Sequence, residues 1–150
     1  MRPAAITPLF LALSAAMLAG CGQPREVFVD KGYVRLSAVP GGTAVAYFTL
    51  HGGAEQATLI SVTSPTVIKT ELHESMTSGT TSTMAPISDV PLPAKANVTF
   101  APGGKHVMLF DVNKSVKPGS TMPLVFTFSN NLRIEYDAPV IAAGDDAPKG

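Results

Sequence analysis

The sequence predicts an all-β protein, built as an antiparallel sandwich or barrel. Short runs rich in β-branched and aromatic residues recur at intervals of roughly ten residues, which is typical of that architecture. Turn residues separate these runs, and the chain contains 13 prolines and 13 glycines. Only 15% of its residues are charged, which also favours a turn-rich β protein over a helical one. No segment has the 3.6-residue apolar period of an amphipathic helix. A chain of this length needs only one hydrophobic core, so one domain is expected.

Turn residues define the limits of each expected strand. Pro40-Gly41-Gly42 ends the first strand, and Ser64-Pro65 separates the third from the fourth, because a residue before proline is biased away from helix. Pro102-Gly103-Gly104 is expected to close one hairpin, and Asn130-Asn131 another, since asparagine tolerates positive φ. The segment 74–83, rich in serine and threonine, is expected to be a polar loop. The expected strands are 31–37, 43–51, 58–63, 66–73, a short piece around Met84, 96–101, 105–112, 122–129 and 132–136.

The N-terminal segment predicts export and lipid attachment. Residues 6–18 are apolar and uncharged and follow Arg2, as in a signal peptide, and they fall short of the roughly 20 residues that a membrane-spanning helix needs. The sequence Leu18-Ala19-Gly20-Cys21 resembles the lipobox of bacterial lipoproteins, in which the cysteine is acylated. We therefore expect a location in the bacterial cell envelope, on the periplasmic side and anchored to the membrane. The expected segments are a signal peptide at 1–20, a lipidated N-terminus and tether at 21–31, a β-sandwich domain at 32–141 and a flexible tail at 142–150.

Cysteine and charge content exclude several functions. Cys21 is the only cysteine, so no intrachain disulfide can form, and a lipid anchor is favoured over a buried structural thiol because of its place after the signal-like run. Without a thiolate, the domain cannot form the two-histidine, one-cysteine site of blue copper proteins. The chain has 11 basic and 11 acidic residues, so it lacks the positive charge expected of a nucleic-acid-binding protein.

Two histidines and two methionines form the candidate metal site. His73, Met84, His106 and Met108 have the spacing H-x10-M-x21-H-x-M. Imidazoles and thioethers are neutral, rather soft ligands, and such a set favours Cu(I) over harder divalent ions. On a strand, His106 and Met108 would project from the same face, about 7 Å apart, so that a metal could bridge them.

The spacing and its flanking residues resemble those of the periplasmic copper chaperones of the PCuAC type. The resemblance covers roughly residues 33–140 and includes the phrases Glu71-Leu72-His73-Glu74 and Pro102-Gly103-Gly104-Lys105-His106. It implies a Greek-key, cupredoxin-like β-sandwich that carries Cu(I). It also implies a copper-accepting partner, either the dinuclear CuA centre of cytochrome c oxidase or a thiol-bearing copper chaperone. We expect a monomer.

Other readings of these residues remain open. Met76 could serve as an auxiliary thioether, whereas His51 is expected at a strand end on the surface and Met122 in the core. Any single methionine could also be core filler. Glu71 shares a face with His73 and could join a zinc site, but there is no HExxH sequence or nucleophile elbow, and no enzyme is expected. The alternative functions are an envelope copper buffer or scavenger and a structural β-sandwich lipoprotein without metal.

Overall fold

The computed structural model describes residues 25–149. The expected signal peptide and the lipidation site Cys21 lie outside these described residues. Within them every regular element is a strand, so the all-β prediction is confirmed, and none of them forms a helix able to cross a bilayer. The strands are β1 (Phe28–Arg35), β2 (Ala44–His51), β3 (Ala57–Thr63), β4 (Val67–Ser78), β5 (Thr81–Pro86), β6 (Val90–Leu92), β7 (Asn97–Phe100), β8 (Lys105–Val112), β9 (Thr121–Phe128) and β10 (Arg133–Ile141).

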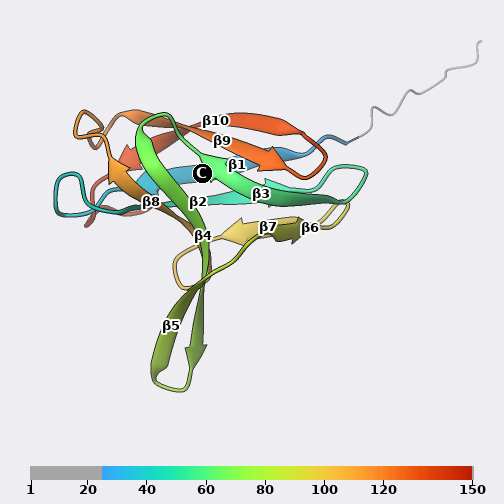
Figure 1. Cartoon of the computed structure of the whole chain (residues 1–150), viewed down its shortest axis with the longest axis horizontal. Helices are drawn as coiled ribbons and strands as arrows, with labels where there is room; N and C mark the ends of the chain where they lie inside the picture. The colour runs from blue at the N-terminus through green and yellow to red at the C-terminus, as the bar shows by residue number, and fades with distance from the viewer. Residues whose placement is uncertain (1–24, 150) are drawn as a thin grey trace, which may run out of the picture.

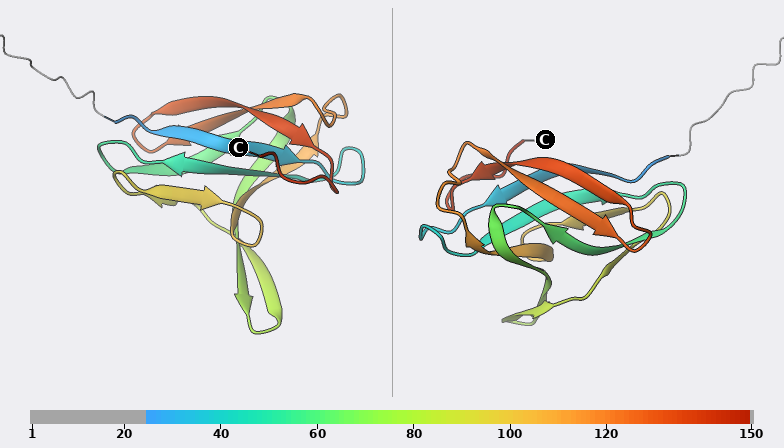
Figure 2. Two further views of the ribbon diagram at one scale, coloured as in Figure 1. Left: turned by 180° about the vertical axis from the view of Figure 1, so that it is seen from behind. Right: turned by 45° about the horizontal axis from the view of Figure 1, so that its top comes forward.

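The strands form a strongly curved sheet in the order β5-β4-β8-β7-β2-β1-β10-β9-β3-β6, with β8 also pairing with β2. Most pairs are antiparallel, while β1 pairs with β10 and β7 with β8 in parallel. Figures 1 and 2 show the strands folded over one another as a layered body, from which the β4–β5 hairpin projects. This hairpin carries one of the expected metal ligands.

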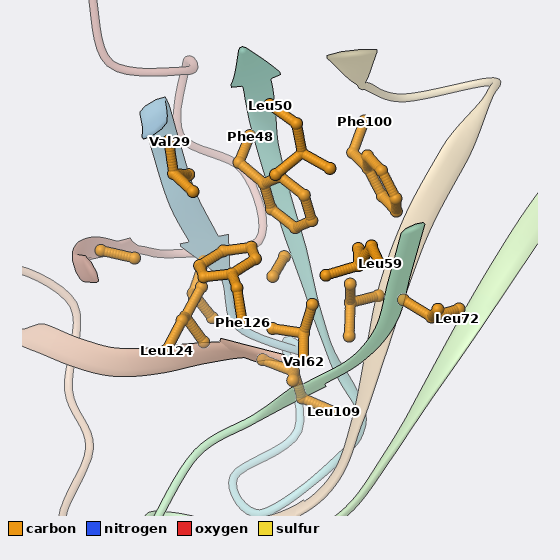
Figure 3. Close-up of a cluster of buried hydrophobic side chains, with 14 of the residues drawn as sticks. Val29, Phe48, Leu50, Leu59, Val62, Leu72, Phe100, Leu109, Leu124 and Phe126 are labelled. Carbon is orange, nitrogen blue, oxygen red and sulfur yellow. The ribbon is translucent and has the colours of Figure 1, made fainter. Parts of the chain in front are cut away.

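The core lies between the layers of the body (Figure 3). Buried and partly exposed residues alternate along β2 and β9, as expected for strands with one face against the core. The ring of Phe48 lies 4.3 Å from that of Phe100 and 4.7 Å, edge-on, from that of Phe126. Because Phe48 lies on β2 and Phe126 on β9, this aromatic cluster joins elements that are far apart in the sequence.

A bulge in β1 explains one glycine. The register of β1 with β2 shifts between Asp30 and Tyr33, and Lys31 has a φ of 51°. The N–H of Gly32 donates to the Tyr136 hydroxyl at 3.1 Å. A Cβ at Gly32 would lie 2.5 Å from the Tyr136 ring, so only glycine fits there without displacing the tyrosine.

The expected polar loop at 74–83 is wrong, because these residues are most of a β-hairpin. β4 continues to Ser78, and β5 starts at Thr81. Gly79 has a φ of 61° and Thr80 is not among the residues of positive φ, as in a two-residue turn of type II′. The sequence resembles a loop because both faces of the hairpin are solvated, which removes the apolar alternation of a half-buried strand.

Other predicted boundaries also need correction. β1 begins at Phe28, inside the segment 21–31 expected as a tether, and the last strand runs on to Ile141 rather than ending at 136. Strand β6 was missed because its middle residue is proline, which is tolerated at the edge of a sheet. The segment 142–150, expected as a flexible tail, is held in its first part by Arg35. The Arg35 guanidinium donates to the carbonyls of Ala142 at 3.4 Å, Ala143 at 3.1 Å and Asp145 at 2.5 Å.

Candidate metal site

His106 is positioned by the alternation of β8. Val107 and Leu109 point into the core, so His106 and Met108 project from the opposite face. His106 is nevertheless only 5% exposed. Its Nδ1 lies 2.9 Å from the carbonyl oxygen of Gly104, which can only accept, so Nδ1 carries the proton in the neutral ring. The lone pair of His106 is therefore on Nε2.

Met84 brings its sulfur to that lone pair. The Met84 Sδ lies 3.3 Å from His106 Nε2, although the two residues are on different strands and Met84 is 54% exposed. A thioether sulfur and an unprotonated imidazole nitrogen are both electron-pair donors. Two such donors at this distance have the chemistry to bind one soft cation together.

His73 lies directly opposite His106 in the β4–β8 pairing, with its ring centroid 5.8 Å away. His73 Nε2 is 2.9 Å from the Oε2 of Glu71. An ionised carboxylate only accepts, so Nε2 donates its proton and the lone pair lies on Nδ1. Nδ1 is buried and has no hydrogen-bond partner among the described residues. A buried, unpartnered nitrogen is costly unless another group binds it, and a metal ion would do so.

Glu71 is held ionised by its neighbours. Lys69 Nζ contacts Glu71 Oε1 at 2.6 Å, and His73 contacts the other oxygen. The hydrogen bond from Lys69, followed by that from His73, lowers the pKa of Glu71 below its ordinary value of 4.5. Glu71 therefore acts as the partner that orients the His73 ring, in the manner of outer-sphere carboxylates at metal sites. The zinc reading of Glu71 finds no support, since residues 25–149 contain no group of three or more His, Cys, Asp or Glu side chains able to hold a metal.

Met108 lies on the same face as His106, two residues along β8, and pairs with Glu71 across β4. The structure thus places it beside the site, without contact between its sulfur and the other donors among the described contacts. Met76 is different. It pairs with Thr83, while Met84 pairs with Ser75, so alternation puts Met76 on the other face of the hairpin, away from His73.

Of the two residues excluded from the site, Met122 lies in the core as predicted, whereas His51 lies at the predicted strand end but not on the surface, since its side chain is only 14% exposed. His51, at the end of β2, contacts Asp30 Oδ1 at 2.8 Å and stacks on Phe28. Met122 is fully buried in the core. The sequence did not predict that the Gly104 carbonyl would fix which nitrogen of His106 is protonated. Nor did it predict that Glu71, itself paired with Lys69, would do the same for His73. Two signals in the sequence pointed to these groups: the phrase around His106, which contains Gly104, and the phrase around His73, in which Glu71 stands two residues before the histidine.

Comparison with solved structures finds the same fold in PCuAC domains. The copper-bound PCuAC domain from PmoF2 superposes with a TM-score of 0.66 at 23% identity, over 80% of this chain and 96% of that domain. Apo-DR1885 from Deinococcus radiodurans superposes with a TM-score of 0.60 at 24% identity, over 97% of this chain and 98% of that protein. Identities this low establish the fold alone. They confirm the expected cupredoxin-like β-sandwich.

Sequence comparison identifies the family. "Putative lipoprotein Lxx21020" of Leifsonia xyli subsp. xyli (strain CTCB07) is 29% identical over 119 residues, which are 79% of this chain and 71% of that relative. The family model described as "Putative lipoprotein LpqE-like" matches residues 27–140, which include strands β1 to β9 and all of β10 but its last residue. The expected PCuAC likeness therefore holds for the fold, and the chain belongs to the LpqE-like lipoprotein family.

Proposed function

We propose that this chain is an exported, lipid-anchored copper(I)-binding protein, not an enzyme, that carries Cu(I) and hands it to a partner. The main support is the distance of 3.3 Å between Met84 Sδ and His106 Nε2. Nε2 is the unprotonated nitrogen of that ring, because Nδ1 donates to the Gly104 carbonyl. The ring of His73, whose buried Nδ1 has no hydrogen-bond partner among the described residues, lies 5.8 Å from that of His106 between centroids. All three donors are neutral and soft or borderline, which favours Cu(I).

Met108 completes the proposed ligand set. It projects from β8 on the same face as His106 and is partly exposed, so a rotation about its side-chain bonds can bring its sulfur toward the metal. Cu(I) would then be held by His73, Met84, His106 and Met108. Met76 is left out of this set because of its place on the other face of the hairpin.

The burial of the ligands supports a carrier that releases its cargo. His106 is almost fully covered, whereas Met84 is half exposed on a projecting hairpin. An incoming ligand would therefore replace Met84 first, while the imidazoles still hold the ion. The recipient that the PCuAC resemblance suggests is the CuA centre of cytochrome c oxidase, or a thiol-bearing copper chaperone. One of the solved structures that share the fold is described as CuI-DR1885, which supports Cu(I) as the cargo.

The decisive test is anaerobic titration of the purified protein with Cu(I) against a competing chelator. We expect one tight equivalent in the wild type and a loss of at least about a hundredfold in affinity for His73→Ala and for His106→Ala. His51→Gln is the matched control, because it changes a histidine outside the site, and it should bind as the wild type does. Equal affinity in all four proteins would refute the proposed site.

Delivery and storage are separated by a genetic test. A deletion strain that loses oxidase activity when copper is scarce supports delivery to the oxidase. A strain that is impaired only by excess copper supports a buffer, which would use the same ligands.

A further inference from the structure

The outer edge of β5 is one of the two ends of the sheet, and it lies next to the proposed metal site. β5 is the first strand in the sheet order, and among residues 25–149 it pairs only with β4. The views in Figures 1 and 2 agree that the hairpin projects from the body, with no other strand alongside β5. A strand in this position presents a row of unpaired N–H and C=O groups.

The hydrogen-bond pattern identifies which of these groups face outward. The N–H of Ser75 donates to the Gly104 carbonyl at 3.1 Å, so the peptide groups of Ser75 face β8 and not β5. The pair Ser75–Met84 is therefore a non-hydrogen-bonded pair of the hairpin, and the N–H and C=O of Met84 point to the free edge. Hydrogen-bonded and non-hydrogen-bonded pairs alternate along the β4–β5 ladder. The backbone N–H and C=O of Ser82, two residues before Met84, therefore also point to the free edge. The turn gives the same assignment. In a hairpin with a two-residue turn the pair next to the turn, here Ser78–Thr81, is hydrogen-bonded, which makes Ser82 and Met84 members of non-hydrogen-bonded pairs.

This edge lacks most of the features that keep edge strands from pairing. Natural edges are protected by lysine, proline, bulges or inward-pointing charges. The segment 75–88 contains no charged residue, the β4–β5 register has no bulge, and the only proline on β5 is Pro86, at its base. At the base of the hairpin, Lys105 and Glu74 are paired with each other at 2.7 Å. The edge is thus neutral, solvated and open along Ser82 and Met84.

We propose that the copper-accepting partner docks by adding an extended segment to the β5 edge, with a cysteine or methionine directly opposite Met84. This proposal rests on the proposed function, and it concerns how the copper site recognises the acceptor protein. Adjacent strands lie about 4.8 Å apart, and side chains of directly opposed residues share a face with Cβ atoms about 5 Å apart. A soft ligand at that position therefore reaches the metal from beside Met84.

The transfer is a ligand exchange without oxidation or reduction. The acceptor thiol loses its proton to solvent, and its sulfur forms a bond to Cu(I) as the Met84 Sδ–Cu bond breaks. The imidazoles then release the ion to further ligands of the acceptor. Because the edge carries no charge, the rate should depend only weakly on ionic strength, unlike electrostatically steered association.

The test compares two short synthetic acceptors with the full-length protein loaded with Cu(I). One peptide alternates threonine and valine around a central cysteine, and the other is the same peptide N-methylated on the amides that would face β5. We expect transfer to the first peptide to be about tenfold faster, the energy of one to two hydrogen bonds. Equal rates would overturn the proposal, because N-methylation removes the backbone donors and leaves the thiol.

A protein variant gives the converse test. Ser82→Pro removes one outward N–H without removing a bond to β4, and Ser82→Ala is its control because it keeps that N–H. Ser82→Pro should slow transfer to the unmethylated peptide several-fold, because a peptide carbonyl loses its donor on β5, while Ser82→Ala should leave that rate unchanged and glutathione should accept copper equally from both. A Ser82→Pro protein that transfers copper to the unmethylated peptide as fast as Ser82→Ala does overturns the proposal. Should this variant fail to fold, the comparison of the two peptides with the wild type decides the matter alone.

Hydrogen exchange separates failure of the docking from failure of the copper site. On adding the unmethylated peptide, the amides of Ser82 and Met84 should become protected even in the metal-free protein. A wild type that binds no Cu(I) but shows this protection refutes the proposed function and leaves the docking edge intact. Unprotected amides overturn the docking. Protection that appears without peptide and rises with protein concentration also overturns it, because a second copy then occupies the edge.

Discussion

The β body and the β4–β5 hairpin use the same backbone pairing but are stabilised differently. The body encloses a core of buried aliphatic and aromatic side chains, including four fully buried phenylalanines, Phe48, Phe100, Phe126 and Phe128. The outer hairpin, 75–86, contributes no residue to that core. It is held by its pairs within the hairpin and, at Ser75, by one bond to Gly104.

The ligands are divided between these two regions. His73, His106 and Met108 lie on strands β4 and β8 where these pair with each other, and Met84 lies on the hairpin. A hairpin without a core opens more easily than packed strands do. The paired strands β4 and β8 therefore fix the positions of the two imidazoles, while the hairpin supplies the Met84 sulfur, which another ligand can replace more easily.

The largest change in the free energy of unfolding should come from a substitution in the core of the body. Phe126→Ala removes a ring that is packed edge-on against Phe48 and should lower the free energy of unfolding by about 3–5 kcal/mol. Thr77→Ala on the exposed hairpin should change it by less than about 0.5 kcal/mol. Urea unfolding followed by circular dichroism measures both. Similar losses in the two variants would contradict the division of stability.

The next effect concerns two methionines of the hairpin. Met84→Leu should weaken Cu(I) binding about tenfold or more, because it removes the sulfur that faces His106. Met76→Leu is matched in chemistry and exposure, at 58% against 54%, but lies on the other face, and should leave the affinity unchanged. Chelator competition gives both constants. A loss in Met76→Leu as large as in Met84→Leu would restore Met76 to the site.

Acid should weaken copper binding at the base of the hairpin. Both imidazoles must be neutral to coordinate, so protons compete with Cu(I) for them as the solution is made more acidic. The thioethers do not titrate. Chelator competition at several pH values should therefore show a falling affinity, and a flat profile would contradict two histidine ligands.

The smallest effect concerns folding of the metal-free protein. The pKa of Glu71 is lowered in the folded state, mainly by the hydrogen bond from Lys69, so its ionised form stabilises the fold. That contribution is present above the ordinary pKa of 4.5 and is lost as the pH falls through the lower, folded-state value. Thermal unfolding should show a small advantage of wild type over Glu71→Gln at pH 7, which disappears in acid. An advantage that grows in acid would have the wrong sign.

Much of the body could be predicted from the sequence because its signals are local. Alternating apolar residues in β2 and β9 and the turns at Pro40-Gly41-Gly42 and Asn130-Asn131 mark strands whose one face is buried. The hairpin could not be predicted in this way. Its serines and threonines are solvated on both faces, so its strands show no alternation, and only pairing with β4 and β8 makes them strands.

The sequence by itself determined the ligand types, their spacing and the face shared by His106 and Met108, because residue identity and the two-residue period of a strand are local properties. Only the tertiary structure decided which nitrogen of each imidazole is free, and on which face Met76 and Met84 lie. Those features depend on the Gly104 carbonyl, the Glu71 carboxylate and the β4–β5 register. Each arises from a contact across strands, and a linear pattern carries no information about which strands are neighbours.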